Sequence, residues 1–112
     1  ETLALALELN GEFGNFHPAM ALPGSPLYYE AKELGVKFPE KLSGYSFFSY
    51  DCQPTGTKYL TPEQVLEFRD KAWNIYFNSP KFLKLVEEKF GQEAKSNIIE
   101  MAKIKLKRKI LE

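Results

Sequence analysis

His17, the only histidine, is the side chain of this sequence best suited to acid, base or ligand chemistry. An imidazole can transfer protons near neutral pH, bind a metal ion or donate a hydrogen bond to a nucleotide. A metal site is disfavoured, because there is no second histidine and no cysteine close by in the sequence. The alternative is a purely structural role, which is the commoner one for a single histidine among aromatic residues.

His17 ends a stretch in which a short aromatic strand is predicted to run directly into a helix. Over residues 13–17 an extended backbone would place Asn15 and His17 on one face. Pro18 lacks an amide proton and would end the strand. A proline-glycine turn follows, and a helix begins at Pro26. Such short joints are typical of α/β barrels, where the carboxyl ends of the strands face the barrel mouth, so we expect any functional site here.

The turn at residues 23–26, Pro-Gly-Ser-Pro, has two interpretations. Gly24 would free the backbone, and the amides at the start of the following helix attract negative charge, so the turn could bind an anion. Alternatively, Gly24 only makes the turn and Ser25 only caps the helix. We favour the second interpretation, because a single glycine does not make a phosphate-binding loop.

Cys52 is the only cysteine. A reactive thiol needs a cationic neighbour or a similar activating group, and no cationic residue lies within two positions, so we expect a packed, unreactive side chain. A single cysteine excludes an internal disulfide and is typical of a reducing compartment, from which we expect a cytoplasmic protein. Glu40 and Asp51 are not predicted to form a catalytic carboxylate pair, because nothing in the sequence sets their separation.

Residues 103–109, Lys-Ile-Lys-Leu-Lys-Arg-Lys, are strongly basic. They could form a nucleic-acid or nuclear-targeting patch. On a helix, however, these cations would surround much of the cylinder, no aromatic residues are interleaved, and cations are favoured near a helix C-terminus in any case. We therefore expect a solvated or subunit-contacting terminal helix and no nucleic-acid partner.

Residues 2–9 alternate leucine and alanine so densely that every face of a helix would be apolar. Gly11, after Asn10, would end this helix. A helix of this kind needs neighbours on all sides, so we expect it to be buried against further barrel elements. Because the chain begins at Glu1 and enters this pattern at once, we also expect it to be part of a longer polypeptide, and to self-associate through residues 1–22 when isolated.

Three later helix starts share one device, a hydroxyl residue followed by proline, at residues 25–26, 61–62 and 79–80. The hydroxyl accepts an otherwise unpaired amide, and proline at the first helical position loses no hydrogen bond. Thr61 and Gln64 add a capping box. Apolar residues at helical spacing, Phe68 among them, complete the pattern. The predicted helices cover residues 26–34, 62–77 and 80–90, followed by a last long helix over 94–106.

Residues 36–60 show no sustained period but contain six aromatic residues. Connections this long are usually functional or packed by their own side chains, and the aromatic residues favour packing. The whole chain, 112 residues that are 44% hydrophobic and 14% aromatic, suits one folded domain. No apolar run is long enough to span a membrane, so no membrane partner is expected. Charge is zero in total, with an acidic first half and a basic end.

The chain resembles the C-terminal part of radical S-adenosylmethionine enzymes of the cobalamin-binding kind. The resemblance rests on residues 18–31 (PAMALPGSPLYYEA), 44–46 (GYS), 57–61 (TKYLT) and 103–109 (KIKLKRK). It implies a mainly α, α+β fold with three parts. These parts are a helix-strand-helix end of the barrel (1–35), an aromatic-rich connector (36–60) and a helical C-terminal extension (61–112).

The resemblance also implies a function for the parent protein. Such an enzyme holds a [4Fe–4S] cluster on a Cys-x3-Cys-x2-Cys motif, cleaves S-adenosylmethionine reductively and abstracts a hydrogen atom from a substrate, in some members with cobalamin. A cluster needs several thiolates, so this chain alone is not expected to hold one or to be an enzyme. By the resemblance, Asn15 and His17 are the candidate contacts to the adenosyl cofactor, and the partner is the remainder of the parent chain. The alternative is a non-catalytic helical binding or assembly module.

Overall fold

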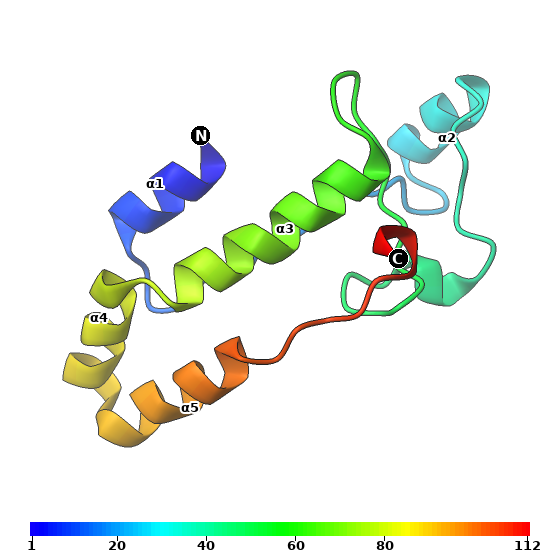
Figure 1. Ribbon diagram of the computed structural model, residues 1–112. Helices are drawn as coiled ribbons and strands as arrows, with labels where there is room; N and C mark the ends of the chain where they lie inside the picture. The colour runs from blue at the N-terminus through cyan, green and yellow to red at the C-terminus, as the bar shows by residue number, and fades with distance from the viewer. The chain divides into compact units, whose positions relative to one another are not determined.

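The computed structural model describes all of residues 1–112 and is mainly helical (Figure 1). Its α-helices are α1 (Thr2–Leu9), α2 (Pro26–Glu33), α3 (Pro62–Phe77), α4 (Pro80–Phe90) and α5 (Gln92–Ala102). Two 3₁₀ helices, η1 (Leu42–Tyr45) and η2 (Lys109–Leu111), complete the regular structure. The mainly α class predicted from the sequence is thereby confirmed. None of these helices has both the length and the apolar character needed to cross a bilayer.

The strand predicted over residues 13–17 is absent, and no other β-strand is present. A strand exists only through the hydrogen-bond ladder that it shares with a neighbour. This chain offers no such neighbour, so alternation of aromatic and polar residues is not enough to form one. The structure therefore does not show the predicted helix-strand-helix barrel piece.

The chain divides into two compact units. The first, here called the helical unit, consists of residues 1–16 and 70–105. The second, here called the connector unit, consists of residues 17–69 and 106–112. Helix α3 contributes residues to both units, those up to Arg69 to the connector unit and those from Asp70 to the helical unit. The units thus interleave segments of the chain, whereas the predicted parts (1–35, 36–60 and 61–112) are consecutive.

The helical unit is built around an aromatic core. Its buried residues come from the end of α3, from α4 and from the end of α5, and are Tyr76, Phe77, Phe82, Val86 and Ala102. The rings of Phe77 and Phe82 meet edge to face, with centroids 5.3 Å apart, and Tyr76 lies 5.0 Å from Phe82. Such arrangements add to the free energy gained by burying the rings. This cluster holds α3, α4 and α5 together.

The N-terminal segment joins this core through polar bonds. The Tyr76 hydroxyl donates to the carbonyl of Gly11 at 2.7 Å, and the Lys81 ammonium donates to the carbonyl of Glu8 at 3.0 Å. Lys89 pairs with Glu12 and holds the pKa of that carboxyl below its usual value, chiefly by a hydrogen bond. The bonds fix the position of the segment that follows α1.

Helix α1 forms where the sequence predicts it but is not buried. It has no buried residue, and Leu5 and Leu9 are 56% and 72% exposed. Only one side of it, at Ala6 and Leu7, packs against the aromatic core. The helix ends at Asn10, which adopts the left-handed conformation (φ 49°) that we expected of Gly11. A largely apolar helix is thus left open on its other sides.

Two of the three predicted caps are confirmed. Ser25 Oγ accepts from the Tyr28 amide at 3.2 Å. Thr61 and Gln64 form the full capping box, with bonds of 3.0 and 3.3 Å. Ser79 occupies the N-cap position of α4, but its side chain makes no capping bond. In α3 the inward stripe is offset from the predicted one, because Leu66 is buried whereas Phe68 is 55% exposed.

The last helix is shorter than predicted. Helix α5 ends at Ala102, and residues 103–108 are not helical. Buried Arg108 donates from Nη1 to the carbonyl of Ser49 at 3.0 Å, and the Lys109 amide donates to the carbonyl of Tyr50 at 3.0 Å. These bonds anchor the end of the basic run within the connector unit. The helix predicted over this run is therefore wrong, while residues 103–107 are exposed, as expected of a solvated run.

Candidate functional site

The two residues predicted to contact a cofactor fall in different units. Asn15 belongs to the helical unit and His17 to the connector unit, so neither unit contains both. Both are exposed. The His17 ring stacks on Phe47, with centroids 4.4 Å apart and planes 15° apart. Their predicted shared face depends on a strand that the structure lacks, and their cofactor role stays a prediction.

The turn at residues 22–26 is a helix start. Gly24 takes a positive φ of 87°, a conformation that favours glycine. Ser25 Oγ donates to the carbonyl of Leu22 at 2.7 Å and accepts from the Tyr28 amide. The predicted turn at Gly24 and the predicted cap at Ser25 are therefore confirmed. Cys52 is fully buried, as expected of a packed side chain.

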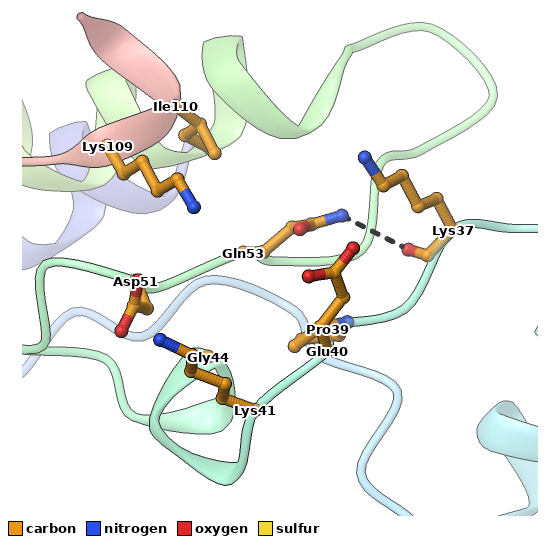
Figure 2. A pocket seen from close by; sticks show the side chains of 9 residues that line it. All are labelled: Lys37, Pro39, Glu40, Lys41, Gly44, Asp51, Gln53, Lys109 and Ile110. Carbon is orange, nitrogen blue, oxygen red and sulfur yellow. Dashed lines mark hydrogen bonds between the residues drawn. The ribbon is translucent and has the colours of Figure 1, made fainter.

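The connector unit contains a cavity of about 240 Å³ that no pattern in the sequence predicts (Figure 2). Pro39, Gly44 and Ile110 form part of its wall. Its polar and charged lining comes from residues far apart in the sequence, namely Lys37, Glu40, Lys41, Asp51, Gln53 and Lys109. No local motif could have revealed it, because only the tertiary structure brings Lys109 to residues 37–53.

Hydrogen bonds hold the wall of this cavity. The Gln53 amide donates to the carbonyl of Gly44 at 2.9 Å, and the Gln53 side chain donates to the carbonyl of Lys37 at 3.4 Å. Ser43 Oγ donates to Asp51 Oδ2 at 3.0 Å. Figure 2 shows Lys109, Gln53 and Glu40 pointing into the cavity from three different segments. The lining therefore consists of charged side chains on a backbone that hydrogen bonds hold in place.

A further hydrogen bond ties Glu112 to the rest of the connector unit. The hydroxyl of Tyr50 donates to the Glu112 carboxylate at 2.6 Å. This bond, followed by partial burial, raises the pKa of Tyr50 above its usual value. Since the protonated phenol is the donor, the stabilisation is present below the ordinary tyrosine pKa of about 10. It is lost as the pH rises through the raised pKa.

Glu112→Gln is accordingly expected to lower the pKa of Tyr50, because it removes the charged acceptor. An NMR titration of the tyrosine rings measures this change. Tyr76 is the internal control, since burial is the main cause of its raised pKa and the substitution does not touch it. An unchanged pKa of Tyr50 in the variant would show that the bond to Glu112 does not form in solution.

The donor set does not suit a metal centre. No group of three or more His, Cys, Asp or Glu side chains is placed to hold a metal ion. A [4Fe–4S] cluster needs several thiolates, whereas the one thiol, Cys52, is buried in the connector unit. The residues of this chain therefore do not fit a cluster.

Comparison of the chain with protein-family models, with curated proteins and with solved structures gives no significant match.

Proposed function

We propose that this chain is the C-terminal part of a radical S-adenosylmethionine enzyme and that it packs against the remainder of the parent chain. The proposal starts from the resemblance over residues 18–31, 44–46, 57–61 and 103–109. In the parent, reductive cleavage of S-adenosylmethionine at a [4Fe–4S] cluster would depend on cysteines outside this chain. Residues 1–35 would contribute the barrel end, 36–60 the connector and 61–112 the extension, in a cytoplasmic protein.

The observation that supports a missing neighbour is the exposure of α1. Six of the ten residues from Glu1 to Asn10 are hydrophobic, yet none of α1 is buried, and Phe13 is also exposed. Burying one leucine contributes about 1.5–3 kcal/mol, so leaving Leu5 and Leu9 in water is costly. Further elements of a barrel would cover these side chains.

Asn15 and His17 are the proposed contacts to the adenosyl group. Both side chains are exposed in this chain, which leaves them accessible to a ligand held by the rest of the parent. The stacking of His17 on Phe47 would orient the imidazole. In this proposal the chain contributes binding groups and no cluster ligand.

The second candidate is a non-catalytic helical module that binds another protein through α1. The exposure of Leu5 and Leu9 favours it as well, because it requires an apolar partner but no cofactor. The two candidates differ in one respect that can be measured. Only the first predicts that full-length protein binds S-adenosylmethionine through residues of this chain.

The test uses the full-length parent. Asn15→Ala is expected to weaken S-adenosylmethionine binding by about 1–3 kcal/mol, because a cofactor group loses its hydrogen-bond partner. His17→Gln, which keeps a donor, should have a milder effect. Calorimetry gives the affinity, and the melting temperature is recorded in parallel.

Two variants serve as controls. Asn97→Ala changes an exposed asparagine on α5 and should leave the affinity unchanged. Gly14→Ala should act through folding instead, since a Cβ there would lie 2.9 Å from Cε1 of Tyr76. If Asn15→Ala binds the cofactor like the unchanged protein at equal stability, the assignment is wrong and the binding-module candidate is favoured.

A further inference from the structure

The cavity of the connector unit is a second candidate binding site, separate from Asn15 and His17. It is smaller than the roughly 300–1,000 Å³ typical of sites for drug-sized ligands. A small molecule would therefore fill it, whereas most of a nucleotide or an adenosyl cofactor would lie outside it.

The charges of the lining are of both signs and are not paired. Lys37, Lys41 and Lys109 line the cavity together with Glu40 and Asp51. No ion pair within 4.0 Å joins any of these residues. In the helical unit, by contrast, lysines 84, 89, 95 and 103 each pair with a glutamate. The cavity thus presents ammonium and carboxylate groups that form no ion pair with one another.

The lining places groups of the two signs next to each other. Figure 2 shows the Lys41 side chain directed to the side of the cavity where Asp51 lies, and Glu40 directed toward Gln53. The hydrogen bond from Ser43 positions the Asp51 carboxylate. The hydrogen bond from the Lys109 amide to the carbonyl of Tyr50 positions the backbone of Lys109. Groups positioned before a ligand arrives lose less conformational freedom on binding.

From size and charge together, we propose that this cavity binds a small zwitterion of the α-amino acid class. The ligand carboxylate would face the lysine ammonium groups, and the ligand ammonium would face Glu40 and Asp51. An ion of one sign only would meet like charges in the same lining, which is destabilising. The inference does not rest on the proposed parent enzyme.

The experiment is an NMR titration of the ¹⁵N-labelled 112-residue chain with L-alanine. Saturable shifts are expected at the amides of Gly44, Gln53 and Ile110, which line the cavity. Acetate, inorganic phosphate and methylammonium, at equal ionic strength, are the one-sign probes. We expect them to bind at least about fivefold more weakly, the factor that one lost exposed ion pair can supply. Added salt should weaken the binding of L-alanine.

Two substitutions test the two signs separately. Lys109→Gln and Asp51→Asn should each weaken L-alanine binding by about fivefold. Lys84→Gln, which changes a lysine of the helical unit, is the matched control and should have no effect. Spectra of the variants away from the cavity show whether the fold is kept.

Three results would overturn the proposal. The first is the absence of saturable shifts on addition of L-alanine. The second is binding of phosphate or acetate as tightly as L-alanine. The third is a loss of L-alanine binding in Lys84→Gln as large as in Lys109→Gln and Asp51→Asn. Equal binding of phosphate would identify a simple anion site instead. None of these results bears on the affinity of the full-length protein for S-adenosylmethionine, so the two proposals fail independently.

Discussion

Phe82→Ala is expected to lower the free energy of unfolding by about 3–5 kcal/mol. Phe82 is fully buried on α4 and contacts the rings of Tyr76 and Phe77. Truncation removes the burial of the ring and leaves a cavity that the neighbouring rings cannot close completely. The only tryptophan, Trp73, lies 4.9 Å from Phe77 and reports on this core. Urea unfolding followed by its fluorescence measures the loss.

Phe90→Ala is the matched control on the same helix. Phe90 is 59% exposed and lies outside the aromatic core, so its truncation should cost far less. Phe82→Leu should fall between the two, because leucine keeps much of the buried volume. Equal losses for Phe82→Ala and Phe90→Ala would mean that α4 presents a different face to the core.

Gly44→Ala is expected to destabilise the connector unit by about 3 kcal/mol, at the upper end of the usual cost of overpacking. Gly44 is buried, and a Cβ there would lie 2.3 Å from Cβ of Pro39 and 3.3 Å from the carbonyl oxygen of Asp51. One of these neighbours must move, and both belong to the wall of the cavity. Hydrogen exchange of the Gln53 amide, which donates to Gly44, measures the loss locally.

A double-mutant cycle separates this clash from other causes. Pro39→Gly removes the nearest atoms, so the cost of Gly44→Ala should be smaller in that background. Gly24→Ala is the comparison for backbone strain alone, since Gly24 has a positive φ but no atom near its Cβ position. An unchanged cost in the Pro39→Gly background would remove the steric explanation.

Local signals in the sequence predicted the helix starts well. Ser25 and the Thr61–Gln64 pair act on amides three residues away, so the residue types alone determine the bonds. The strand over residues 13–17 failed for the opposite reason, since a strand depends on a partner segment. The end of α5 also depends on distant atoms. Nothing near Arg108 in the sequence shows that its guanidinium bonds to the carbonyl of Ser49.

The candidate sites also divide into features that neighbouring residues determine and features that depend on distant residues. The turn at Gly24 and the packed Cys52 were predictable from neighbouring residues. The cavity was not, because Lys109 reaches residues 37–53 only through the bonds of the last seven residues. Glu40 and Asp51, dismissed as a catalytic pair for lack of any fixed separation, both line this cavity.

The interleaving of the two units has a consequence for biosynthesis. Residues 17–69 leave the ribosome well before residues 106–112, yet both belong to the connector unit. A chain synthesised at about 5–20 residues per second folds its domains in the order in which they emerge. The bonds from Arg108 and Lys109 to Ser49 and Tyr50 can therefore form only after translation has passed residue 109. We expect the segment around Ser49 and Tyr50 to reach its final structure after residues 106–112 have emerged.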